Sequence, residues 1–209
     1  MNKSKIEWCD FTSNPIRGKC LHGCWYCYAE RIRQRFNEPE EVCFHDSELG
    51  AIRRRKKPAT IFIGSTHDIF GDWVTDAWIE AILSICKQKH EHTFLFLTKN
   101  PKRYLHFQFP GNCWCGATVT EPADYFYYGP QTFVSIEPLM ADIGPVHIGI
   151  EQIIIGAMTG PNAVKPKREW VENIIDLNPG KPIFVKDNLL KLFPDLSRRE
   201  LAWPIGDRK

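Results

Sequence analysis

Six short runs rich in β-branched and aromatic residues constrain the fold more than any other feature of the sequence. They are Thr60–Ser65, Thr93–Lys99, Cys113–Val119, Thr132–Pro138, Gln152–Ala157 and Ile183–Asp187. Each run is almost continuously apolar instead of alternating with polar residues, which is typical of strands buried on both faces. A weaker first strand is predicted within Phe11–Gly18.

Helical patterns lie between some of these runs. One is predicted over Cys24–Arg35, a second over Asp76–Lys89, and a third from Lys167 or Arg168 to Leu177. Strands that alternate with helices indicate βαβ units and a parallel sheet. A full eight-fold barrel typically needs about 250 residues. We therefore expect a partial TIM-like (β/α)6-7 barrel that forms a single domain over residues 1–209.

The composition is that of an ordinary soluble globular protein, with 43% hydrophobic and 25% charged residues and a net charge of +2. No apolar run is long enough to span a bilayer, so no membrane partner is expected. The sequence begins without the apolar segment of a secretory signal, which favours a cytoplasmic location. The eight cysteines are clustered, which indicates thiols kept reduced for a metal and not a disulfide scaffold.

Three of the cysteines, Cys20, Cys24 and Cys27, have the spacing C-x3-C-x2-C. Three thiolates on a [4Fe–4S] cluster leave one iron open to a small molecule, whereas four would saturate a metal site. A zinc site with His22 as fourth ligand is an alternative, as are ordinary buried thiols. Cys9, Cys43 and Cys86 are expected to be buried or incidental thiols, and Cys113 with Cys115 a buried core pair.

Polar residues follow the predicted strands at their carboxyl ends, where α/β folds gather their chemistry. They are Ser65, His67, Asp68, Thr98, Lys99, Thr120, Glu121, Glu137, Thr159, Lys186, Asp187 and Asn188. Lys99 is placed to bind an anionic ligand, with a surface ion pair as the alternative. Glu137 is an ion-pair or ligand-binding candidate. His67, Asp68, Lys186 and Asp187 are the candidate catalytic residues facing a substrate.

The cysteine spacing, with Tyr26 directly before the last cysteine, resembles the signature of the radical S-adenosylmethionine (SAM) superfamily. The blocks "IEWCDFTSNP", "CYAER", "IFIGSTHDIF", "HTFLFLTKNPKRY", "SIEPL" and "IIIGAMTGP" resemble, in this order, the phage Gp37/Gp68-type family. This similarity covers nearly the whole chain. Met158 departs from it, because an acidic residue is common at that position.

The resemblance implies a [4Fe–4S] cluster held by the three cysteines and chelated by SAM at its open iron. An electron from a low-potential donor would cleave SAM, and the resulting 5′-deoxyadenosyl radical would abstract hydrogen from the substrate. Tyr26 and Tyr28 would lie near the cluster and adenine. Further roles are implied for Ser65 and Thr66 at the SAM amino group, Lys99 at the carboxylate and Glu137 at the ribose.

The substrate implied by the phage association is a hypermodified base in DNA. One fitting reaction is isomerisation of an amino-acid adduct on a thymine methyl group, in the host cytoplasm if the protein is phage-encoded. A small-molecule or peptide substrate is an alternative. A second class is a zinc-stabilised nucleic-acid-binding module without catalysis, with "RRRKK" (residues 53–57) and "DYFYYGP" (residues 124–130) as its contact surface.

Overall fold

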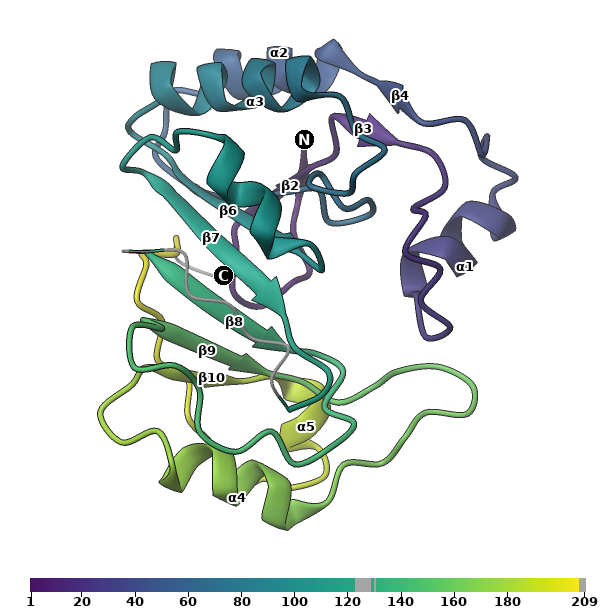
Figure 1. The fold of residues 1–209 in the computed structure, drawn as a ribbon. Helices are drawn as coiled ribbons and strands as arrows, with labels where there is room; N and C mark the ends of the chain where they lie inside the picture. Colours follow the sequence, from purple (N-terminus) through teal and green to yellow (C-terminus); the bar gives the residue numbers. More distant parts are fainter. Residues whose placement is uncertain (123–128, 130, 207–209) are drawn as a thin grey trace. The chain divides into compact units, whose positions relative to one another are not determined.

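The computed structural model describes residues 1–122, 129 and 131–206. The chain forms two compact units, one of Met1–Cys115 with Trp203–Lys209 and the other of Gly116–Ala202 (Figure 1). Strand β7 (Cys113–Thr118) contains the boundary between them. The single domain over the whole chain stays a prediction.

The sheet of the first unit is mostly parallel. Its strands are, in spatial order, β1 (Asn2–Lys3), β2 (Phe11–Ser13), β5 (Thr60–Ile63) and β6 (Thr93–Thr98). β1 is antiparallel to β2, whereas β2, β5 and β6 are parallel to one another. All four residues of β5 are buried, as the continuous apolar run predicts.

A separate two-stranded sheet follows β2. Strand β3 (Ile16–Arg17) pairs antiparallel with β4 (Cys43–Phe44), with Ile16 opposite Phe44 and Arg17 opposite Cys43. The weak strand expected within Phe11–Gly18 is therefore two short strands in two different sheets. The segment between β3 and β4 contains the cysteine loop, so the β3–β4 pair closes that loop at its base.

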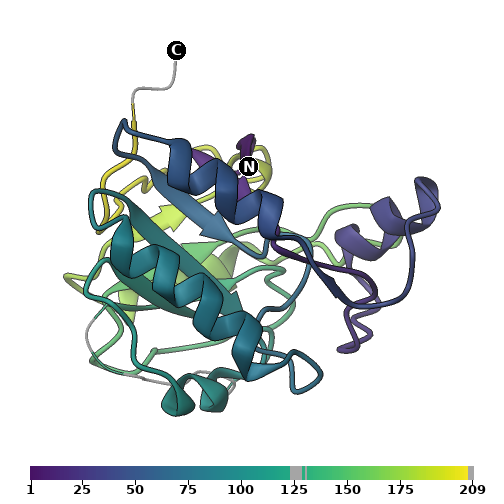
Figure 2. The same ribbon diagram turned by 90° about the horizontal axis from the view of Figure 1, so that it is seen from above.

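The helices of the first unit are α1 (Tyr28–Arg35), α2 (Asp46–Arg54), α3 (Asp76–Gln88) and the 3-10 helix η1 (Pro101–His106). Helices α2 and α3 lie side by side, and α1 lies apart from both (Figures 1 and 2). Phe44 stacks on Trp78 of α3, with ring centroids 5.8 Å apart.

The basic run "RRRKK" is partly helical, because Arg53 and Arg54 form the last turn of α2. Burial of Leu49 and Ile52 holds this helix in place. Cations in a last helical turn are favourable, since the carboxyl end of a helix is partially negative. Arg55 follows the helix and packs over the ring of Phe11, 4.1 Å from its centroid.

The second unit contains the parallel strands β8 (Thr132–Ile136), β9 (Gln152–Ile155) and β10 (Ile183–Val185). Its helices are α4 (Arg168–Asp176) and α5 (Asp187–Leu190). Val171 and Ile174 of α4 are fully buried in one apolar cluster with residues of the three strands. The apolar stripe of the helix thus covers the sheet that the sequence predicted.

The prediction of an α/β fold with mostly parallel strands is confirmed within each unit. All six strong strand predictions coincide with a strand, from β5 to β10. In the part of the chain that the structure describes, neither unit's strands close into a barrel. No described helix is both long enough and apolar enough to cross a membrane.

Candidate functional site: a three-cysteine loop and the strand ends beside it

The cysteine loop leaves β3 through Gly18, whose φ of +109° is accessible to glycine at little cost. A side chain at this position would also collide with the backbone of Val42, whose Cα would lie 2.8 Å from the added Cβ. The backbone N–H of Lys19 donates to the Glu40 carbonyl at 2.9 Å. The loop therefore starts from a tight backbone contact with the segment that returns to β4.

Helix α1 begins later than predicted, because Cys27 is its N-cap residue. The Cys27 sulfur accepts a hydrogen bond from the Glu30 N–H at 3.4 Å, and the Cys27 N–H donates to the Cys24 carbonyl at 3.0 Å. Residues 24–27 are accordingly a turn and not the first turn of the predicted helix. The turn orients the last two cysteines of the motif.

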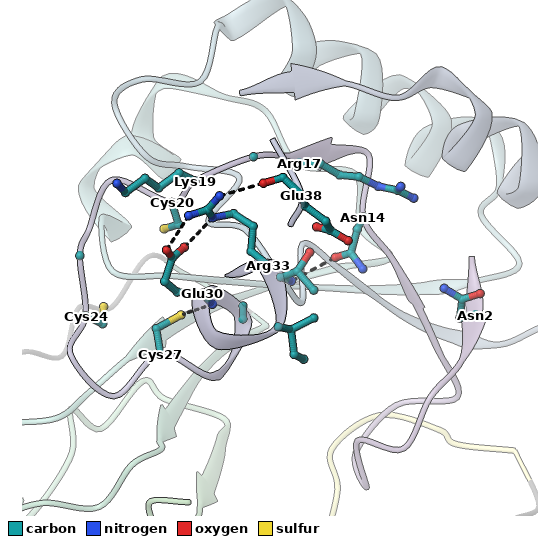
Figure 3. Close-up of a pocket in the computed structure, with 15 residues that line it drawn as sticks. Asn2, Asn14, Arg17, Lys19, Cys20, Cys24, Cys27, Glu30, Arg33 and Glu38 are labelled. Atoms are coloured by element: carbon teal, nitrogen blue, oxygen red, sulfur yellow. Dashed lines mark hydrogen bonds and ion pairs between the residues drawn. The ribbon is translucent and has the colours of Figure 1, made fainter. Parts of the chain in front are cut away.

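All three cysteines line one pocket of about 330 Å³ (Figure 3). Each of them is a free, partly exposed thiol. Burial raises the pKa of the Cys20 thiol, while hydrogen bonds from the backbone N–H groups of Asp68 and His22 act in the opposite direction. The sequence spacing has therefore brought three accessible sulfurs to the wall of a single cavity.

Arg33 of α1 lines this pocket, is largely buried and ties the helix to the returning chain. Its guanidinium makes a two-pronged ion pair with Glu30, at 2.8 and 2.7 Å, and donates to the Glu38 carbonyl at 2.8 Å (Figure 3). The hydrogen bonds from Arg33 hold the pKa of Glu30 at about 2. A bidentate pair of this kind fixes orientation as well as charge.

The loop after β5 meets the cysteine loop. Gly64 turns this loop with a φ of +83°, and a Cβ on it would lie 2.8 Å from the His67 carbonyl oxygen. The Asn14 side-chain oxygen accepts from the Ser65 hydroxyl and from the Thr66 N–H, both at 3.1 Å. The Tyr28 hydroxyl donates to the Ser65 carbonyl at 2.5 Å.

Asp68 is the centre of a hydrogen-bond network. Its Oδ2 lies 2.7 Å from His22 Nε2 and accepts from the Thr98 hydroxyl and the Lys99 N–H, both at 2.9 Å. Its Oδ1 accepts from the Phe70 N–H at 2.9 Å. One carboxylate thus joins the cysteine loop, the β5 loop and the end of β6.

His67 is buried, and both of its ring nitrogens have partners. The Trp73 indole N–H donates to Nε2 at 2.8 Å, so the proton of the neutral ring is on Nδ1, which lies 3.2 Å from the Gly18 carbonyl. Burial lowers the pKa of His67, and the bond to Gly18 opposes this shift. The neutral imidazole therefore anchors the first residue of the cysteine loop.

Lys99 points toward the cysteine turn. Its ammonium lies 5.4 Å from the centroid of the Tyr26 ring, and Tyr26 also hydrogen-bonds Cys24. Burial raises the pKa of the Tyr26 hydroxyl, and its hydrogen bond with Lys99 acts against that. The cation predicted at the end of β6 thus lies over the ring of Tyr26, the residue directly before the last cysteine of the motif.

The remaining predicted residues belong to the second unit. Lys186 is ion-paired with Glu137. An ion pair was one of the two roles that the sequence suggested for Glu137. The pair lies over Gly156, where a Cβ would be 3.0 Å from Lys186 Cδ and 3.1 Å from Glu137 Cδ. Asp187 pairs with Arg199 at 2.7 Å. Within this unit, the carboxyl ends of β8 and β10 therefore share one charge pair.

The described residues contain no group of three or more His, Cys, Asp or Glu side chains placed to hold one metal ion. This does not support the Cys3His zinc alternative, because His22 is engaged with Asp68. A cubane cluster makes a different demand, since each thiolate binds a separate iron atom. The loop fits that demand in its donors: three thiols border one cavity, and N–H groups point at Cys20 and Cys27.

In the first unit, the structure brings most of the predicted site residues together. Cys20, Cys24, Cys27 and Thr66 line the pocket, and Tyr26, Tyr28, Ser65, His67, Asp68 and Lys99 contact its loops. Asn14 and Arg33 were missed, although Asn14 stands at the carboxyl end of β2, where polar residues were sought. The tyrosines of "DYFYYGP" lie outside the described residues.

Fold and site together define a class: an α/β protein whose parallel strands carry, at their carboxyl ends, a three-cysteine loop. The chain belongs to a family described as "Protein of unknown function (DUF5131)", whose model matches residues 3–183. No curated protein and no solved structure matches the chain.

Proposed function

We propose that this protein is a radical SAM enzyme whose [4Fe–4S] cluster is held by Cys20, Cys24 and Cys27. The observation that carries the proposal is the convergence of the three free thiols on one pocket, with Lys99 and the β5 loop beside them. A structural thiol set would need no cation and no open cavity next to it. The partial (β/α)6-7 barrel belongs to this proposal.

When bound, the cluster and SAM would supply the one-electron chemistry that starts hydrogen abstraction from a substrate. The residues of this chain would bind SAM and orient it beside the cysteine turn. Lys99 binds the SAM carboxylate by charge, and Ser65 and Thr66 offer polar groups to its amino group. Tyr26 and Tyr28 pack beside the cysteine turn and limit the access of water to it.

The four candidate catalytic residues fall into two groups. His67 and Asp68 position the cysteine loop through Gly18 and His22, so their contribution is to orientation. Lys186 and Asp187 remain the candidates for groups that face the substrate, with Glu137 as the ribose ligand. In the structure Lys186 is ion-paired with Glu137, and Asp187 is ion-paired with Arg199.

For the substrate we propose a hypermodified base in DNA, with isomerisation of a thymine adduct as the reaction. A low-potential electron donor is the required partner. Small-molecule and peptide substrates are the competing class. The cysteine loop and its supporting contacts serve either class equally.

The decisive experiment begins with anaerobic purification and reconstitution with iron and sulfide. A cluster protein is brown and loses its colour in air, whereas a zinc protein is colourless. Incubation with SAM, reductant and deuterated candidate DNA follows, and deuterium in 5′-deoxyadenosine supports the substrate assignment. Iron-loaded protein that cleaves SAM without deuterium transfer from DNA would redirect the search to small molecules and peptides.

A further inference from the structure

A second pair of chemically active side chains lies outside the cysteine loop. Cys43 begins β4 and His45 directly follows the strand, so the two residues are two apart and the extended chain directs both side chains to the same face. The Cys43 sulfur lies 3.2 Å from His45 Nε2. Both residues are partly exposed, so of the two expectations for Cys43, a buried or an incidental thiol, the structure excludes the buried one.

The opposing strand places a basic residue across from Cys43. Arg17 stands directly opposite Cys43 in the β3–β4 pair, and side chains opposed in this way lie on the same face. Thiolates are stabilised beside cationic Arg and His side chains. Two independent features of the fold, a strand register and a side-chain contact, therefore point at one thiol.

Nearby carboxylates are already engaged. Asp46 follows His45 and contacts Arg53 at 3.4 Å, while Glu48 binds Arg17 at 2.9 Å and the amino terminus. The remaining neighbour from α3 is Trp78, which stacks on Phe44 and carries no charge. The imidazole of His45 thus faces the thiol within reach of its proton.

We propose that Cys43 and His45 form a reactive thiol–imidazole pair that undergoes exchange with small-molecule disulfides. His45 takes the proton of the Cys43 thiol, and the thiolate attacks one sulfur of the disulfide. A new S–S bond to Cys43 forms as the old S–S bond breaks, and the departing thiolate receives the proton from His45. No further oxidant is consumed, and the step does not depend on the proposed cluster.

The test measures, for each cysteine separately, the rate at which glutathione disulfide modifies the full-length protein. Peptide mass analysis reports Cys43 apart from Cys20, Cys24 and Cys27, whatever state the loop is in. At pH 7 we expect His45→Gln to slow modification of Cys43 roughly tenfold, since an ordinary thiol is only a few per cent ionised there. His90 is exposed, and His90→Gln is the matched control; it should leave the rate of Cys43 modification unchanged.

A pH profile of the unaltered protein supports the same test without any substitution. The rate at Cys43 should vary little between about pH 6.5 and 8, whereas an ordinary thiol gains about tenfold per pH unit in this range. A tenfold rise per unit at Cys43 would overturn the proposal. So would a folded His45→Gln protein whose Cys43 reacts at the wild-type rate.

Discussion

His22 Nε2 lies 2.7 Å from Asp68 Oδ2, and this contact joins the cysteine loop to the loop that follows β5. The same carboxylate oxygen accepts from Thr98 and from the Lys99 N–H. The Asp68 side chain is only 8% exposed, so its hydrogen bonds are largely shielded from water. Through Asp68, the positions of the thiols and of Lys99 depend on one another.

Asp68→Ala should therefore loosen the site and destabilise the first unit. Removal of the carboxylate leaves the Thr98, Lys99 and Phe70 donors without their acceptor, at a cost on the order of 1–3 kcal/mol in the free energy of unfolding. Chemical unfolding of the purified protein measures this loss. The exposed Asp176→Ala is the control and should stay close to the wild type; equal stability of both variants would remove Asp68 from its central role.

Gly64→Ala should disturb the same site through the backbone. The alanine would need a left-handed φ, and its Cβ would lie 2.8 Å from the His67 carbonyl. We expect a loss of about 1–3 kcal/mol in stability, together with weaker iron binding. Gly111→Ala is a matched control, because nothing lies within 4 Å of its Cβ. Similar unfolding curves for the two variants would contradict this account of the turn.

The stability of the fold should fall as the pH drops below about 6.5, the ordinary value for an unfolded histidine. Burial lowers the pKa of folded His67, so between the folded pKa and about 6.5 the unfolded chain binds more protons than the folded one. Stability is fully present above this window and decreases as the pH falls through it.

Unfolding titrations at several pH values test this expectation in the wild type and in His67→Gln. Burial also lowers the pKa of His92, which contributes to the pH dependence in the same direction. The difference between the two proteins isolates His67. Identical pH dependence in both would show that the Trp73 and Gly18 contacts do not hold the neutral ring.

Lys99→Ala should weaken SAM binding and leave the iron content unchanged. The lost charge contact in a partly dry site should cost on the order of 1–3 kcal/mol, or roughly ten- to a hundredfold in affinity. Equilibrium binding of SAM to the reconstituted protein measures this loss of affinity. Lys102 is an exposed lysine three residues further on, and the Lys102→Ala variant should bind SAM with the wild-type affinity. Unchanged affinity in Lys99→Ala at normal iron content would remove this residue from the site.

Much of the fold was predictable because its strands are buried on both faces. In a chain of this size, continuous apolar runs such as Thr60–Ile63 indicate few structures other than a strand buried on both faces. Helix α2 escaped prediction because only Glu48, Leu49 and Ile52 of its nine residues are buried, which leaves a short stripe beside a conspicuous basic run. Its helical state depends on packing against α3 more than on a local pattern.

The candidate site was predictable where strand ends determine position, as for Lys99 and Asp68. It was not predictable where a side chain reaches across loops. The bond between Trp73 and His67, and the bond from Arg33 to the Glu38 carbonyl, arise from loop paths that no periodicity encodes. Cys43 illustrates the same limit, since the register of two short strands places Arg17 opposite it.

The measurement that tests the central claim most directly is the iron and sulfide content of Cys24→Ala after anaerobic reconstitution. Loss of one of three thiolates removes a ligand outright, so we expect cluster assembly to be abolished and not merely slowed. Cys43→Ser, which removes a partly exposed thiol outside the loop, should assemble a cluster as the wild type does. A Cys24→Ala protein that still holds four irons and produces 5′-deoxyadenosine would contradict the account.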